Sequence, residues 1–322
     1  MQPNITKEVR ISTAILLSIL CITIYITQEQ IIPEYFFIDS QTINDLLKYH
    51  DLSNYPKNSF STTAYIYETL GQTLSQALIL LAALSTIAFI CLNSRPSSFL
   101  AVAIIFTIPF CIFNLKYSKE NLVILMNLTI CLLLKHEKPG NAVKLIIIAT
   151  SYTVYSYYFR PYFAFISILL PAIYIIVNNP NKRSIIITAI IIICLAIPSE
   201  LWTQLQQSRD MVNEGREGLS NSKTAFTNLL EPNGFLSAIP NSLYGLVRFY
   251  FSPVFSFRPQ EIVLSSVLWG VTALAFKKCN CKSPIFCLIA SNFILQTFFE
   301  PDLGSFFRHM MAYIFCLYAT TR

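Results

Sequence analysis

Apolar residues in this chain form long uninterrupted runs rather than the short alternating segments of a water-soluble domain. Two of the clearest runs extend over residues 11–27 and 163–177. A helix of about 20 mostly apolar residues crosses about 30 Å of hydrocarbon, and runs of this kind are typical of membrane spans. The pattern predicts ten membrane helices, at residues 11–28, 74–93, 98–115, 121–134, 145–159, 162–179, 184–199, 262–276, 283–299 and 305–320.

The charges between these segments predict the orientation of the helices. With a cytoplasmic N-terminus, basic residues outnumber acidic ones in every short connection on the cytoplasmic side, for example at Lys182 and Arg183. Lys and Arg favour cytoplasmic loops, so both termini are predicted to be cytoplasmic. The expected fold class is an all-α polytopic transmembrane bundle in which residues 1–322 form a single transmembrane domain. Two long loops, 29–71 and 200–261, are expected on the other side, and the second carries an aromatic segment, 249–257, suited to the membrane interface.

Composition supports a membrane protein and argues against other classes. Hydrophobic residues make up 54% of the chain and charged residues only 12%, against about a quarter charged in a typical soluble domain. The net charge of +6 does not indicate a nucleic-acid partner, because the basic residues are scattered between apolar segments. Cys279 and Cys281 have the wrong spacing for a zinc site and no second ligand pair nearby, so no metal is expected.

Several charged residues are predicted to lie at membrane depth because two of the apolar segments are short. About 14 apolar residues separate Glu120 from Lys135, and a helix of that length is about 21 Å long. The shortfall draws Lys119 and Glu120 below the outer interface, and the same argument applies to Arg160. Buried charges in a membrane are costly unless they pair or line a water-filled cavity, so they are functional candidates.

The last segment carries further charges into its outer end. Residues 300–309 read Glu-Pro-Asp-Leu-Gly-Ser-Phe-Phe-Arg-His and lead directly into an apolar run, which leaves Arg308 and His309 inside the outer third of the predicted helix. Arg248 precedes the aromatic segment and adds one more candidate. These residues also have structural explanations. Lys119 and Glu120 could form an interfacial pair that snorkels, Arg160 could cap its helix by reaching headgroup phosphates, and Glu300 with Arg308 could form an ion pair that locks the last two helices.

The residue types suit an anionic, sugar-bearing ligand. Guanidinium groups match phosphate oxygens geometrically and stay charged, and tyrosine rings such as Tyr158 and Tyr162 stack on sugars. A carboxylate would accept the proton of an attacking sugar hydroxyl while arginines stabilise a departing diphosphate, with no cofactor required. The predicted catalytic residues are Glu300, Asp302 and Arg308, and the predicted substrate-binding residues are Lys119, Glu120, Tyr158, Arg160, Tyr162, Arg248 and His309.

With ten predicted helices, two long loops and the motifs Tyr-Ser-Lys119-Glu120, Phe-Arg160-Pro-Tyr and Glu300 to His309, the chain resembles Wzy-type polymerases of bacterial O-antigen or capsule repeat units. The resemblance implies a multi-pass protein of the bacterial inner membrane. It would join polyprenyl-diphosphate-linked oligosaccharides on the periplasmic face, with membrane lipid, chain-length regulator and flippase proteins as partners. The chain departs from the pattern in being short and in lacking the arginine-to-glycine motif that some members carry in their large loops.

Two other functions remain open at this level. A multi-helix lipid-sugar-dependent glycosyltransferase would use an acidic residue after the first helix, Glu34 or Asp39. A flippase or transporter of lipid-linked sugars needs charges along a path open to each side in turn. The charged residues here stop at the outer third of the helices, which disfavours transport. A purely structural membrane subunit is the simplest remaining alternative.

Overall fold

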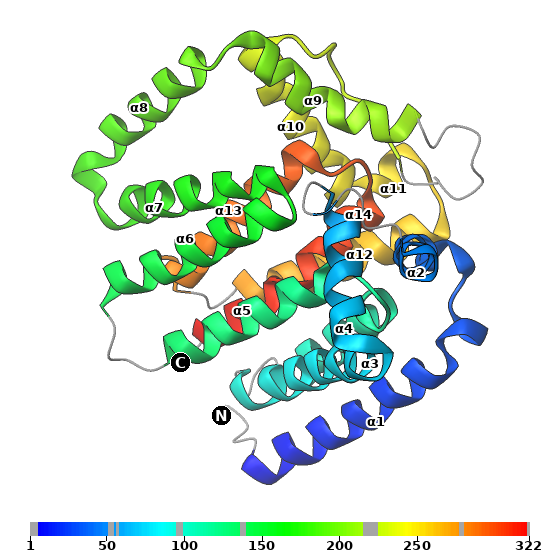
Figure 1. The fold of residues 1–322 in the computed structure, drawn as a ribbon. Helices are drawn as coiled ribbons and strands as arrows, with labels where there is room; N and C mark the ends of the chain where they lie inside the picture. Colours follow the sequence, from blue (N-terminus) through cyan, green and yellow to red (C-terminus); the bar gives the residue numbers. More distant parts are fainter. Residues whose placement is uncertain are drawn as a thin grey trace.

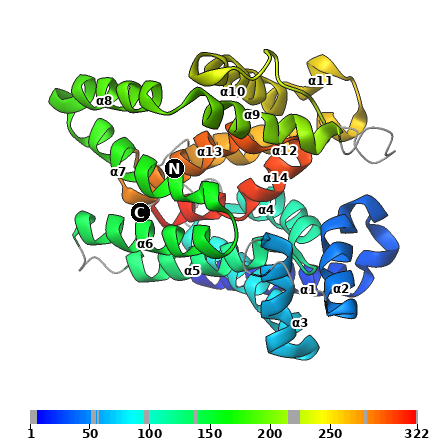
Figure 2. The ribbon, with the colours of Figure 1, turned by 45° about the horizontal axis from the view of Figure 1, so that its top comes forward.

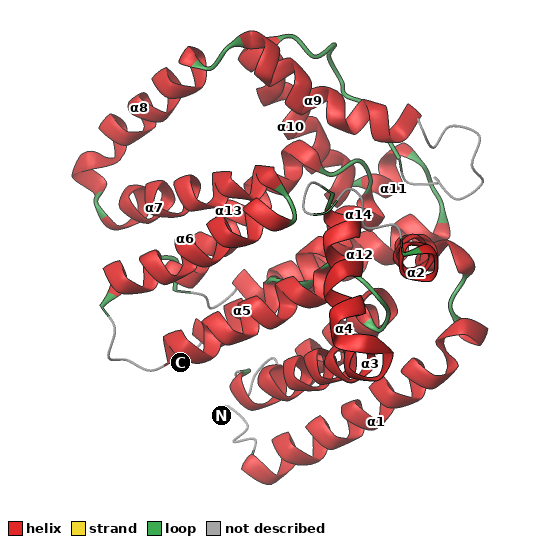
Figure 3. Ribbon diagram, viewed as in Figure 1, coloured by secondary structure: helices red, strands yellow, loops and turns green. Residues whose placement is uncertain are grey.

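The chain folds into a bundle of α-helices. The computed structural model describes residues 6–50, 55, 58–94, 99–135, 140–214, 225–276 and 280–320, and these residues contain no β-strand (Figure 3). The all-α prediction is therefore confirmed. The helices are α1 (Lys7–Ile31), α2 (Ile38–Tyr49), α3 (Ser59–Asn93), α4 (Phe99–Asn114), α5 (Glu120–Lys135), α6 (Asn141–Tyr158), α7 (Ala164–Asn178), α8 (Arg183–Ala196), α9 (Ser199–Glu214), α10 (Gly234–Tyr250), α11 (Ser252–Phe255), α12 (Pro259–Phe276), α13 (Pro284–Phe299) and α14 (Leu303–Met311), with 3₁₀ turns η1 (Glu34–Phe37), η3 (Pro161–Phe163), η4 (Pro180–Lys182) and η5 (Ile314–Thr320).

Some of these helices are long and apolar enough to cross a membrane. Within the described residues, three helices qualify, at Lys7–Ile31, Ser59–Asn93 and Pro161–Asn178. Residues Pro180–Ala196 and Ser199–Glu214 qualify together but bend by 90° at their junction. Each of the ten predicted segments falls on helical structure, yet helices such as α5 and α13, with 16 residues each, are only about 24 Å long. The apolar helices suggest membrane association, and the count of ten spans stays a prediction.

The helices pack around a large apolar core. Helix α13 packs between α7 and α10, and α3 packs against α1 and α4 (Figures 1 and 2). The chain's last segment, α14 with η5, lies inside this core, and most of its described side chains, such as Phe307 and Phe315, are buried. Helix α8 stands apart, because it packs on α7 and has no buried residue (Figure 1). The core thus encloses the segment that carries Arg308 and His309.

The predicted continuous helix at 305–320 is wrong in one respect. The α-helix ends at Met311, and a 3₁₀ turn begins at Ile314. The carbonyl of Ala312, at the break, accepts a hydrogen bond of 3.0 Å from the side chain of Asn127 on α5. Because a side chain supplies the hydrogen bond that the helix would otherwise make, the break is tolerated inside the core.

The two segments predicted as long loops are largely helical. Residues 29–71 contain the end of α1, η1, α2 and the first turns of α3, which bends at Gly71, where φ is 73°. Residues 200–261 contain most of α9 together with α10, α11 and the start of α12. The aromatic segment 249–257 divides: Phe249 is buried and stacks on Phe306 at 4.2 Å, whereas Phe257 is 85% exposed. These segments cover one end of the bundle, where the charged residues meet.

Candidate functional site

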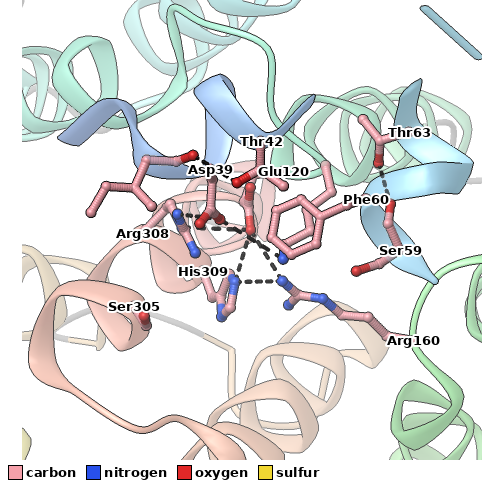
Figure 4. A network of polar contacts seen from close by, with 12 residues as sticks. Asp39, Thr42, Ser59, Phe60, Thr63, Glu120, Arg160, Ser305, Arg308 and His309 are labelled. Atoms are coloured by element: carbon pink, nitrogen blue, oxygen red, sulfur yellow. Dashed lines mark hydrogen bonds and ion pairs between the residues drawn. The ribbon is translucent and has the colours of Figure 1, made fainter. Parts of the chain in front are cut away.

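The charged residues meet because several helices begin or end at the same end of the bundle. Helix α5 begins at Glu120, Arg160 lies between α6 and η3, and α13 ends just before Glu300. The last turn of α14 contributes Arg308 and His309 (Figure 4). Together with Asp39, Lys116 and Lys119, described below, these residues form what we call the ion cluster.

Glu120 lies at the centre of the ion cluster and is 2% exposed. Its Oε1 atom accepts a hydrogen bond of 3.3 Å from Nη2 of Arg160 and lies 3.6 Å from Nε of Arg308. It also lies 2.8 Å from Nε2 of His309 (Figure 4). One carboxylate therefore faces two arginines and a histidine, and a carboxylate buried this deeply requires such partners.

His309 connects Glu120 to the second buried carboxylate, Glu300. The His309 Nδ1 atom lies 2.5 Å from Oε1 of Glu300, while its Nε2 atom lies 2.8 Å from both Glu120 and Arg160. A doubly protonated ring donates to both carboxylates, whereas a ring without the Nε2 proton accepts a hydrogen bond from Arg160 instead. The imidazole ring of His309 therefore bridges the two buried carboxylates.

Asp39 joins the ion cluster from α2, far away in the sequence. Its Oδ2 atom lies 2.7 Å from Nη1 of Arg308 and 3.8 Å from Nζ of Lys119. Burial raises the pKa of Asp39, but the positive charges of Arg308 and Lys119 outweigh burial, and the net shift is downwards. The Asp39 and Arg308 side chains are 20% and 17% exposed, so they form the open edge of the cluster.

Two lysines complete the ion cluster. Lys116 donates a hydrogen bond to the carbonyl of Phe36, and Lys119 lies 3.9 Å from the centre of the Phe60 ring. Burial lowers the pKa of Lys116 to about 7, with a contribution from Arg308, and lowers that of Lys119 to about 8, with a contribution from Arg160. The cluster therefore contains four basic side chains and three acidic ones, and half of the basic charge is lost as the pH rises through these values.

Four of the predicted site residues lie elsewhere or contribute differently. Asp302 is the N-cap of α14 and accepts a hydrogen bond of 2.8 Å from the backbone of Ser305, so its carboxylate has a structural partner. Arg248 stacks on Phe226 and Phe255, at 5.2 and 4.5 Å from the ring centres, and joins no ion pair among the described residues. Their sequence signals were charge and position, which do not distinguish a cap or a stacked side chain from a ligand group.

The two predicted tyrosines also differ from each other. Tyr162 stacks on Phe299 at 4.5 Å and lies 6.0 Å from the Arg160 guanidinium, at the border of the ion cluster. Tyr158 is 40% exposed and lines a separate apolar groove of about 680 Å³ between α5 and α6. The same groove contains Tyr155, whose hydroxyl is buried without a hydrogen-bond partner among the described residues. The groove therefore reaches the side of the site where Arg160 lies.

Sequence reasoning weighed Asp39 only for a glycosyltransferase and gave no role to Lys116 or to Arg209 of α9. Asp39 and Lys116 lie in polar connections whose fold the apolar pattern does not predict. The sequence did contain a signal for Arg209, because Gln206, Arg209 and Asn213 recur at the spacing of one helix face. In the structure all three side chains are buried.

Within the described residues, no group of three His, Cys, Asp or Glu side chains has the arrangement of a metal site. Comparison of the chain with protein-family models, curated proteins and solved structures gave no match. The function must therefore be argued from the ion cluster.

Proposed function

We propose that the protein is a multi-pass protein of the bacterial inner membrane that polymerises oligosaccharide repeats linked to a polyprenyl diphosphate on the periplasmic face. The observation that carries the proposal is the ion cluster, in which four basic side chains outnumber three carboxylates at one end of an apolar bundle. A buried excess of basic groups, opening at Arg308 and Asp39, suits an anionic headgroup. The proposal includes the ten spans and cytoplasmic termini expected from the sequence.

In the proposed reaction, a hydroxyl of the acceptor sugar attacks the anomeric carbon of the donor repeat. The bond between that carbon and the diphosphate oxygen breaks, and the diphosphate leaves with the electron pair. Arg308, Arg160 and Lys119 stabilise the departing negative charge, as preorganised cations do for other leaving groups. Glu300 accepts the proton of the attacking hydroxyl, and His309, 2.5 Å away, stabilises the carboxylate before transfer.

The apolar groove beside the ion cluster supports a lipid-borne donor. Its lining runs along α6 from Ile146 to Phe159, about 20 Å of helix. This stretch covers almost the whole predicted span 145–159, so a long hydrocarbon chain fits along it. A hydrocarbon chain lying in the groove would end beside Arg160, where the diphosphate would bind.

The experiment is a gel of surface polysaccharide from a deletion strain complemented with variants present at equal membrane levels. Glu300→Gln and Arg308→Ala should leave single repeats on the carrier, whereas Asp302→Asn should restore the ladder because asparagine also caps a helix. An unchanged ladder in the deletion strain refutes the proposal. If both site variants restore a normal ladder, the ion cluster only stabilises the fold and takes no part in the reaction.

A second function has one observation in its favour. Asp39, the acidic residue after the first helix that a lipid-sugar-dependent glycosyltransferase would use, lies 2.7 Å from Arg308. Such an enzyme would add a single sugar from a lipid-linked donor, with Asp39 as the base. Its loss would leave truncated repeat units, whereas loss of a polymerase leaves complete single units. The composition of the lipid-linked products in the deletion strain therefore separates the two functions.

A further inference from the structure

Arg209 is a buried arginine whose hydrogen-bond partners are almost all backbone carbonyls. It lies on α9, is 1% exposed, and has no ion pair within the described part of the chain. Its Nε atom donates to the carbonyl of Glu300 at 3.1 Å, and its Nη2 atom donates to the carbonyls of Thr297 and Phe298 at 2.5 and 3.2 Å. Three carbonyls at the end of α13 therefore share one guanidinium.

These contacts have a clear physical basis. The last carbonyls of a helix have no partner within the helix, and together they carry a partial negative charge. A guanidinium offers five donors in a fixed plane, so it can satisfy several carbonyls and be stabilised by them. Its Nη1 atom is held from the other side by the carbonyl of Asn241 at 3.3 Å and by Oδ1 of Asn228 at 3.1 Å. The side chain is thus fixed in orientation from both directions.

A second residue of α9 holds the next carbonyl in the chain. The Asn213 side chain donates to the carbonyls of Pro301 at 3.1 Å and of Phe226 at 2.7 Å. Arg209 and Asn213 together bind the backbone on both sides of the Glu300 carboxylate. Helix α10 closes the arrangement, since a methyl group on Gly245 would lie 2.9 Å from the Thr297 carbonyl and 3.0 Å from Nη2 of Arg209.

We infer that Arg209 is a positioning residue for Glu300. By fixing the carbonyls of Thr297, Phe298 and Glu300 it sets the corner between α13 and α14, and that corner holds the Glu300 carboxylate 2.5 Å from His309. The structural part of this role is independent of the proposed function, and only its effect on activity rests on that function. Within the described residues, Arg209 makes no hydrogen bond or ion pair with a charged side-chain group of the ion cluster, so its contacts act on the backbone that carries Glu300. Its positive charge also acts on the Glu300 carboxylate through space.

The first measurement is amide hydrogen exchange of the purified protein at residues 297–303, which needs no activity. Arg209→Gln should speed exchange in this corner, and Arg209→Lys should do so less, because an ammonium retains the charge but cannot hold three carbonyls in one plane. Gly245→Ala tests the same corner without removing the charge. Its matched control is Gly270→Ala on α12, where the added methyl group would only touch Ile105 at 3.8 Å.

The second measurement is the pH profile of repeat-unit transfer for the same variants. A displacement of about 1 Å can slow a reaction by about 100-fold, so Arg209→Gln and Gly245→Ala should slow transfer by roughly tenfold to 100-fold. Both should shift the acidic limb of the profile, because Glu300 loses its fixed contact with His309; Arg209→Lys should recover part of the rate.

The inference is wrong if the amides of residues 297–303 exchange in Arg209→Gln and Gly245→Ala at the same rate as in the wild type, whatever the activity of the variants. Faster exchange with an unchanged pH profile and full activity also overturns it, since the corner would then move without affecting Glu300. A wild-type protein that transfers no sugar, combined with faster exchange in the variants, refutes the proposed function and leaves the structural part of the inference standing.

Discussion

Replacing Glu120 by glutamine should destabilise the protein strongly while hardly changing its shape. The glutamine fills the same volume but removes the carboxylate that lies 3.3 Å from Arg160 and 3.6 Å from Arg308. After the change these guanidiniums face each other with a neutral group between them. His309 also loses one of its two carboxylate partners.

The size of the effect follows from these distances. With an effective dielectric constant of 20, each contact between Glu120 and an arginine amounts to roughly 5 kcal/mol. Their sum overstates the loss, because the substitution also removes the cost of burying the carboxylate. Breaking a buried ion pair by removing one partner usually costs about 3–5 kcal/mol, and we expect Glu120→Gln to fall in this range.

Equilibrium unfolding in mixed detergent micelles measures this free energy. The matched control is Glu68→Gln, because Glu68 pairs with His50 at 2.5 Å but the side chains are 34% and 75% exposed. An exposed pair contributes little, so the control should lose less than about 1 kcal/mol. Combining Glu120→Gln with Arg308→Gln should cost less than the sum of the single changes. Wild-type stability of Glu120→Gln, or strict additivity in the double variant, refutes this account of the cluster.

Four further outcomes are expected. Between about pH 6 and 9, affinity for inorganic diphosphate measured by calorimetry should fall as Lys116 and Lys119 lose their protons; Lys119→Gln should flatten this dependence. The free energy of unfolding should rise over the same interval, because both folded-state pKa values lie below the usual lysine value and the unfolded chain binds more protons; stability that falls instead contradicts the burial argument. Asp39→Asn should lower the free energy of unfolding by less than the roughly 3–5 kcal/mol expected for Glu120→Gln, because its pair with Arg308 is partly exposed, and should leave complete repeat units on the carrier; truncated units would favour the transferase. Gly71→Ala should lower the free energy of unfolding by about 1–3 kcal/mol because φ is 73° there, whereas Gly270→Ala in α12 should not lower it. Equal unfolding midpoints for the two variants would contradict this.

The sequence predicted the helices well because their signal is local. Long apolar runs determine where helices form, and the shortness of the segments that begin after Glu120 and end before Arg160 indicated which charges lie at their ends. The structure brings these two residues within 3.3 Å of each other and adds Glu300, Arg308 and His309. That these residues carry a reaction stays a prediction.

The missed features depend on contacts between distant segments. Asp39 enters the ion cluster only because α2 folds back over the end of the bundle, and no local pattern specifies that packing. The break after Met311 depends on Asn127, a residue on another helix. Asp302 caps α14 through its contact with Ser305, and the sequence alone does not distinguish such a cap from a catalytic carboxylate. The catalytic role of Asp302 stays a prediction.

The placement of α14 inside the core has a consequence for synthesis. Glu120 and Arg160 leave the ribosome long before Arg308 and His309, which are separated from Arg160 by about 149 residues. Until α14 arrives, Glu120 has a single arginine partner and Glu300 lacks its contact with His309. The nascent chain therefore contains an incomplete ion cluster beside apolar helices. The final segment completes the ion cluster and also fills the core around it. A chain that stalls before Leu303 should retain its helices yet remain a target for membrane quality control.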